Sequence, residues 1–101
     1  MYYVYIIRCI DNSLYTGITT DVLRRFEEHK SGNGAKYTKV HKPVKIEICW
    51  ETDNKVNASK LEFWIKKLTK QDKEKLIKNQ ICLENVCDRI DKNKYQKSDF
   101  F

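Results

Sequence analysis

The chain has 101 residues, of which 41% are hydrophobic and 34% charged, and this composition suffices for one small domain with a core. Three glycines and one proline exclude collagen-like and linker-like chains, and no apolar run is long enough to span a bilayer. The N-terminus lacks a secretory pattern, so we expect a cytoplasmic protein. The four cysteines lack the spacing of a zinc site and are expected to be free thiols.

The first elements predicted along the chain form a hairpin. Residues 2–9 are β-branched and aromatic, which is typical of a strand. Alternation divides the side chains between two faces, with Tyr3, Tyr5, Ile7 and Cys9 on one and Tyr2, Val4, Ile6 and Arg8 on the other. Asp11 and Asn12 predict a turn, and residues 13–17 predict the returning strand.

The hydrophobic period then changes to that of a helix. We expect a helix over residues 22–30, capped at its start by Thr20 or Asp21. A connection rich in glycine and lysine follows over residues 31–43. Apolar and polar residues alternate regularly over residues 44–51, which predicts a strand.

Two more helices are expected over residues 58–68 and 71–78, each with an apolar stripe. In the tail, apolar residues recur at the spacing of an amphipathic helix: Leu83, Val86, Cys87 and Ile90. Residues 92–101 have no period and are expected to fray. We therefore divide the chain into a domain over residues 1–80 and a tail over residues 81–101.

One stretch of the chain carries only positive charge, within a net charge of +6. Between residues 30 and 45 there are five lysines and no acidic residue: Lys30, Lys36, Lys39, Lys42 and Lys45. Such a segment attracts polyanions, and nucleic acid is the commonest of them in a cell. The alternative is a surface whose lysines serve only solubility.

Five residues are candidates for chemistry: Tyr5, Tyr15, Arg25, His29 and Glu62. The two tyrosines belong to adjacent strands, and the arginine and histidine are i, i+4 neighbours on one helix flank. The glutamate lies along the apolar stripe of the next helix, where a carboxylate without a partner is costly. Structural alternatives remain open: the tyrosines could be ordinary core residues, and Glu62 could form a capping box with Ser59 unless Asn57 is the cap.

In this order, the motifs resemble the GIY-YIG endonuclease domain, and in particular its small single-domain bacterial members related to Slx-type structure-selective nucleases. The segments that carry the resemblance are Val4-Tyr5-Ile6, Tyr15-Thr16-Gly17, Arg24-Arg25, His29, Gly34-Ala35-Lys36-Tyr37-Thr38, Pro43-Val44-Lys45 and Glu62-Phe63-Trp64-Ile65-Lys66-Lys67-Leu68. Valine replaces glycine in the first motif and threonine replaces isoleucine in the second. The resemblance implies an α+β fold, with a three-stranded antiparallel sheet flanked by about three helices. The tail helix, which the spacing of its apolar residues predicts, would follow this domain.

The resemblance also implies roles for the candidate residues. Glu62 would hold Mg²⁺, or Mn²⁺ in its place, and a single carboxylate suits a cation that keeps most of its waters. Arg25 would clamp phosphate oxygens with its planar fork, and His29 would be an auxiliary polar residue. Tyr5 and Tyr15 would lie near the attacking water, with Tyr5 as the proton acceptor. We expect a nearby arginine and metal to lower the tyrosine pKa from its usual value near ~10.

The sequence thus predicts a divalent-metal-dependent DNA endonuclease of DNA repair or recombination. In the alternative, the chain is a nucleic-acid-binding module with weak or no catalysis that acts with a protein partner. In either case the tail would be available to dock on a partner that supplies target choice, and the protein would be a monomer or a weak dimer. No membrane interaction is expected.

Overall fold

An antiparallel sheet forms the centre of the protein, and the computed structural model describes it within residues 1–99. Strands β1 (Tyr2–Cys9) and β2 (Leu14–Thr19) form the predicted hairpin, and β3 (Pro43–Thr52) pairs with the other side of β1. A short strand, β4 (Gln96–Lys97), pairs with β3. The α+β class is confirmed, but the sheet has four strands in the order β2-β1-β3-β4, so the prediction of three strands was wrong.

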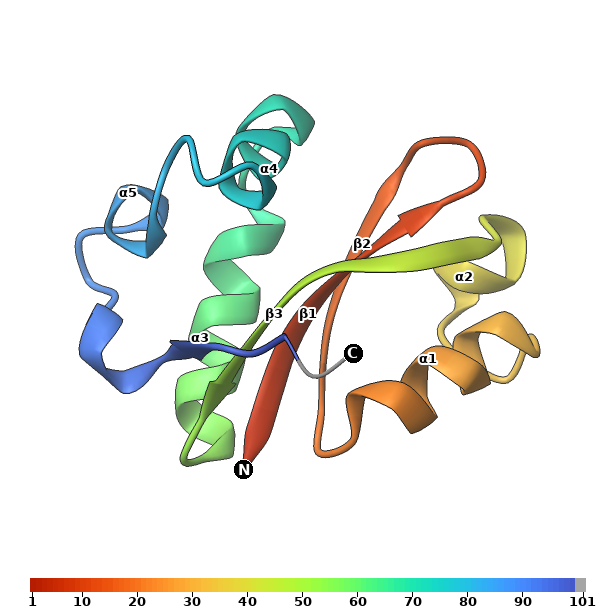
Figure 1. The fold of residues 1–101 in the computed structure, drawn as a ribbon, viewed down its shortest axis with the longest axis horizontal. Helices are drawn as coiled ribbons and strands as arrows, with labels where there is room; N and C mark the ends of the chain where they lie inside the picture. The colour runs from red at the N-terminus through yellow and green to blue at the C-terminus, as the bar shows by residue number, and fades with distance from the viewer. Residues whose placement is uncertain (100–101) are drawn as a thin grey trace.

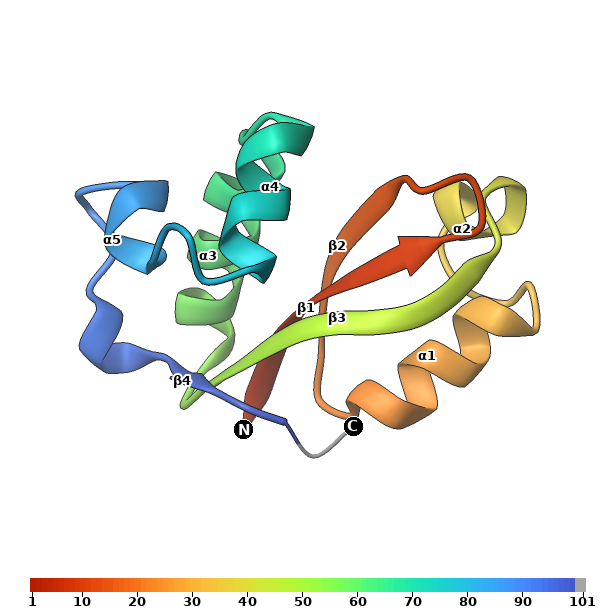
Figure 2. The same ribbon diagram turned by 45° about the horizontal axis from the view of Figure 1, so that its top comes forward.

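The helices cover both faces of this sheet (Figure 1). On one face lie α1 (Val22–Lys30) and α2 (Lys36–Val40). On the other face lie α3 (Lys55–Lys66), α4 (Lys70–Ile77) and the short α5 (Leu83–Val86), which Figure 2 shows from a second angle. No helix within residues 1–99 is long and apolar enough to cross a membrane.

Two separate apolar cores result, one on each face of the sheet. The predicted alternation along β1 holds, because Val4 and Ile6 belong to the core under α3 whereas Tyr5, Ile7 and Cys9 belong to the core under α1. The four cysteines are free thiols, as expected.

The regular alternation predicted for the third strand is interrupted in the structure. Pairing between β1 and β3 shifts by one residue, since Ile6 lies opposite Ile48 and Ile7 lies opposite Ile46. Glu47 is the extra residue of this bulge, and a bulge moves the side chains beyond it to the other face. Ile48 therefore packs in the α3 core, and Ile46 packs against the α1 core.

The second long helix begins earlier than the sequence predicts. Its cap is Asn54, whose side-chain oxygen accepts from the Asn57 backbone N–H at 2.8 Å. Ser59 lies inside α3, so neither Ser59 nor Asn57 is the cap and the capping-box interpretation of Glu62 was wrong. The connection over residues 31–43 also contains a short helix, α2, that its composition did not indicate.

The tail is part of the folded structure. Leu83, Val86 and Ile90 are buried in the α3 core, although helix α5 ends at Val86 rather than continuing to Ile90. The prediction that the end of the chain frays was wrong for residues 92–99, which form a 3₁₀ turn and strand β4. Residues 100 and 101 lie outside the described part of the chain.

Candidate active site

The candidate residues meet at the β2 edge of the sheet, where helices from both faces come together. Tyr5 on β1 and Tyr15 on β2 both face α1, and their ring centroids are 6.4 Å apart. Gly17 lies opposite Tyr5 in the strand register. A Cβ atom at Gly17 would lie 2.5 Å from the Tyr5 hydroxyl oxygen, so the absence of a side chain there makes room for that hydroxyl.

A chain of hydrogen bonds leads inward from Tyr5. Its hydroxyl lies 2.8 Å from Nε2 of His29, and Nδ1 of the same ring lies 2.7 Å from Oγ1 of Thr38. The Thr38 hydroxyl donates to the backbone oxygen of Ala35 at 3.0 Å, so its oxygen is left to accept from His29. This assigns the proton to Nδ1 and makes Nε2 the acceptor of the Tyr5 hydroxyl.

Burial and a nearby cation keep the His29 ring neutral. The side chain is 1% exposed, and burial lowers its pKa from 6.5 to about 4, with Arg25 acting in the same direction. Gly34 packs so closely against this ring that a Cβ there would lie 2.2 Å from Nδ1. The ring is thus held in one position and in one protonation state at neutral pH.

The pKa of Tyr5 is raised in the protein without a bound metal, whereas the predicted decrease concerns a site in which both the arginine and a metal are in place. The residue is 2% exposed, and burial is the main cause, with Tyr15 and Glu62 acting in the same direction. Arg25 opposes this effect but does not outweigh it. Tyr5 is therefore a neutral hydrogen-bond donor in the protein without a bound metal.

Arg25 and Glu62 approach the tyrosines from opposite faces of the sheet, and each is paired with a residue of its own helix. Arg25 Nη1 lies 3.0 Å from a carboxylate oxygen of Glu28, and this pairing raises the pKa of Arg25. Glu62 lies 3.3 Å from Lys66 Nζ, and that nitrogen is also 5.8 Å from the Tyr15 ring centroid. Lys66, a residue of α3, therefore contacts both Glu62 on its own helix and the ring of Tyr15 on the edge strand β2.

The fit to a divalent cation depends on Glu62. Residues 1–99 contain no group of three or more acidic, histidine or cysteine side chains that could enclose a metal. Mg²⁺ does not need such a cage, because it binds through one or two carboxylates, its own waters and the phosphates of a substrate. The half-buried Glu62 carboxylate, which like Arg25 acts on Tyr5, therefore suits Mg²⁺ or Mn²⁺.

All five lysines of the basic stretch are exposed: Lys30 ends α1, Lys36 and Lys39 lie on α2, Lys42 precedes β3 and Lys45 lies on β3. The stretch therefore covers the α2 side of the molecule, next to the tyrosine pair. Two of the lysines contact acids, at 3.7 Å for Lys30 with Glu27 and 3.4 Å for Lys45 with Glu47.

Three residues near the site were not identified as candidates from the sequence. Thr38 orients His29 as described above, and its contact depends on α2, which was not predicted. Tyr37 stacks on Tyr15 at 5.8 Å between ring centroids, and His41 stacks on Tyr37 at 4.2 Å. Only Tyr37 and Thr38 lay in a segment of the resemblance, and nothing in the spacing indicated these contacts.

Comparison with known proteins identifies the class to which this fold and site belong. The model of the GIY-YIG catalytic domain family matches residues 1–76, so the chain belongs to the GIY-YIG family. The resemblance drawn from the motifs is thereby confirmed.

Three relatives of similar length all carry the name UPF0213 protein. It is 53% identical to the UPF0213 protein FN1575 of Fusobacterium nucleatum over 76 residues, which cover 75% of this chain and 76% of that protein. It is 43% identical to the UPF0213 protein YsiG of Lactococcus lactis, covering 89% and 88% of the two chains. The solution NMR structure of the UPF0213 protein BH0048 from Bacillus halodurans matches with 43% identity and a TM-score of 0.52, covering 79% and 86%.

Proposed function

We propose that this protein is an endonuclease that hydrolyses phosphodiester bonds in DNA with a divalent cation, Mg²⁺ or Mn²⁺, in DNA repair or recombination. The observation that carries the proposal is the convergence of two tyrosines, an arginine and a carboxylate at one sheet edge, beside an exposed basic stretch. Membership of the GIY-YIG family supports it.

Arg25 and Glu62 take the charged roles in this proposal. The guanidinium of Arg25 would bind two phosphate oxygens in place of the Glu28 carboxylate. Glu62 would hold the cation, which supplies positive charge against the negative charge that develops on the phosphate oxygens. Lys66 would then leave Glu62 and remain near Tyr15, where a phosphate group can pair with it.

Burial distinguishes the two tyrosines. The Tyr5 hydroxyl already donates to His29 and its ring is covered, whereas Tyr15 is half-buried and borders the surface between α2 and α3. We therefore assign the substrate-facing role to Tyr15, which would position the attacking water or accept its proton. Tyr5, which is hydrogen-bonded to His29, would hold the Tyr15 ring in place. Tyr15→Phe should remove cleavage without changing stability, whereas Tyr5→Phe should lower stability as well.

The basic stretch would bind the DNA backbone on either side of the cut. Each phosphate contact on duplex DNA contributes about −0.9 to the slope of log K against log salt. Replacing Lys36 and Lys39 together by glutamine should therefore flatten that slope by up to about 1.8, the value for two phosphate contacts. An unchanged slope would move the backbone contacts to other lysines, such as those of α3.

The decisive experiment is a cleavage assay on labelled duplex, nicked, flapped and branched DNA with Mg²⁺, with Mn²⁺ and with EDTA. Glu62→Gln and Arg25→Ala should fold normally and lose cleavage by at least a hundredfold, because each removes a charge that acts on the phosphate. Glu84→Gln, which alters an exposed carboxylate on α5, is the matched control and should cleave normally. Metal-independent binding without any cleavage would replace this proposal by the non-catalytic binding module.

A further inference from the structure

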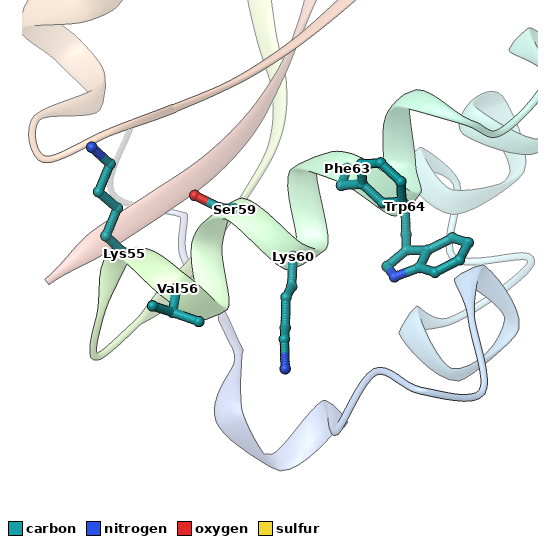
Figure 3. Close-up of a pocket in the computed structure, with 6 residues that line it drawn as sticks. All are labelled: Lys55, Val56, Ser59, Lys60, Phe63 and Trp64. Atoms are coloured by element: carbon teal, nitrogen blue, oxygen red, sulfur yellow. The ribbon is translucent and has the colours of Figure 1, made fainter.

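The outer face of α3 is apolar and basic at once. Val56 and Phe63 lie two helical turns apart and are 66% and 52% exposed. With four neighbours from the same helix they line a shallow hollow of about 450 Å³: Lys55, Ser59, Lys60 and Trp64. Figure 3 shows that the lining side chains all come from this one helix, so the hollow is open along its length. Its volume is within the range of sites that bind small organic groups.

The lining combines flat rings with positive charge. The Phe63 and Trp64 rings meet edge to face, with centroids 5.1 Å apart. Lys67 Nζ lies 4.8 Å from the Phe63 ring centroid, and the lining itself includes two further lysines but no acidic residue. Phe63 is exposed, whereas Trp64 is partly buried against the α3 core. An exposed aromatic ring flanked by lysines suits nucleic acid, because a base stacks on the ring while the lysines pair with the backbone.

The position of this face relative to the candidate active site indicates which part of a nucleic acid it would meet. Phe63 directly follows Glu62, and Lys66 on the same helix reaches Tyr15. Glu62 and Phe63 point about 100° apart around α3, so a strand held at Glu62 would bend around the helix to reach the hollow, as an unpaired strand can. Bases paired in a duplex are stacked on one another and present only their edges, so only unpaired bases can use these rings.

A second copy of this chain fits the face poorly. A symmetric dimer would bring the same surface of each copy together, and Lys55, Lys60 and Lys67 of both copies would then share one interface. Like charges brought together in this way oppose association.

We propose that the outer face of α3 binds unpaired nucleotides next to the cut, which directs the enzyme to DNA with a single-stranded segment. That the bound nucleotides lie next to the cut rests on the proposed nuclease function. The stacking site itself rests on the side chains of α3 alone. Phe63 is the main stacking platform, and Lys60 and Lys67 pair with the phosphates on either side of the base.

The test measures binding in EDTA, where no cleavage can occur. Fluorescence anisotropy would compare three labelled probes of equal length: oligothymidylate, an abasic oligonucleotide of the same charge, and a duplex. Phe63→Ala should weaken the binding of oligothymidylate by roughly 5- to 140-fold, the range for loss of one stacked base. Binding of the abasic and duplex probes should change less than twofold.

Leu23→Ala is the matched control, since Leu23 is an exposed apolar residue on α1, on the other face of the sheet. It should leave all three affinities unchanged. Equal effects of Phe63→Ala and Leu23→Ala, or an equal loss for the abasic probe, would overturn the stacking site. A concentration-dependent dimer that Phe63→Ala abolishes would assign the face to a second copy instead.

A cleavage assay separates this inference from the proposed function. If the wild type cleaves flapped DNA and Phe63→Ala slows that reaction at least fivefold while duplex cleavage is retained, both stand. If both proteins cleave flapped DNA equally, the nuclease function stands and the inference fails. If the wild type cleaves no DNA but binds oligothymidylate through Phe63, the stacking site stands and the nuclease function fails.

Discussion

Acidification should destabilise this protein through His29, at a higher pH than that at which Asp11 and Glu74 become protonated. The ring is buried and neutral, with a pKa near 4 against 6.5 for an accessible histidine. Between these two values the unfolded chain binds a proton that the folded chain does not, so the free energy of unfolding falls as the pH falls. Between pH 8 and pH 5 the two pKa values correspond to a loss of about 2 kcal/mol, and the full loss below pH 4 is about 3 kcal/mol.

Urea unfolding at pH 8, 7, 6 and 5 measures this loss as a decrease in the midpoint at constant slope. The window isolates the histidine, because Asp11 and Glu74 have pKa values lowered to about 2 and lose their contributions only as the pH falls below about 4.5. NMR titration of the ring protons gives the pKa directly, with the His41 signal identified by a His41→Gln variant.

Replacing the hydrogen-bond partner of the ring supplies the control. Thr38→Val leaves Nδ1–H buried without an acceptor and should cost roughly 1–3 kcal/mol at pH 7, whereas Thr38→Ser keeps the hydroxyl and most of the stability. If the unfolding midpoint is the same at pH 8 and pH 5, or the His29 ring titrates near 6.5, the ring is not enclosed as described. The hydrogen-bond chain from Tyr5 would then not be the resting state of the site.

Three further predictions concern the packing around the site and the tail. Gly17→Ala should displace the Tyr5 ring and cost about 1–3 kcal/mol in urea unfolding, and an unchanged midpoint would show that the strands can separate to admit the methyl group. Thr16→Val should be neutral or stabilising by thermal melting, because the Thr16 hydroxyl is buried without a partner; a decrease in Tm would reveal a hydrogen bond that the structure does not show. A variant ending at Gln80 should have a sharply lower Tm and an exposed Trp50, since the tail buries three large apolar side chains worth about 1.5–3 kcal/mol each, and a Tm within a few degrees of the wild type would contradict this.

The sequence predicted the elements that local patterns determine. The β1–β2 hairpin and helix α1 depend on alternation, a turn and a capping aspartate, all of which are local. Strand β4 could not be predicted in this way, because Gln96 and Lys97 are polar and pair with β3, which is distant in the sequence. The Thr52 side chain holds the residues before β4 beside β3 by donating to the Lys94 backbone oxygen at 2.7 Å. This contact joins segments far apart in the sequence.

The residues of the candidate site were named from the sequence, whereas the burial around them was not. Motif spacing and the family resemblance named the tyrosines, Arg25 and Glu62, and the structure brings these residues to one edge of the sheet. The direction of the Tyr5 pKa shift depends on how much water reaches the hydroxyl, which is set by Gly17 and His29 from two other elements. A sequence gives the charges near a group, whereas burial, which here outweighs the effect of Arg25, is a property of the assembled fold.

The ion pairs within each helix have a consequence for how the proposed substrate is admitted. Arg25 is paired with Glu28 and Glu62 with Lys66, so the site is neutralised by its own neighbours before any phosphate arrives. All four side chains are partly exposed, and such pairs stabilise a protein by only about 0–1 kcal/mol each. A bidentate arginine–phosphate contact is stronger than either pair, so a phosphate can displace Glu28 at little cost. In the proposed function, a phosphate that also pairs with Lys66 would release Glu62 for a cation, so the binding of phosphate and the binding of a cation would favour each other.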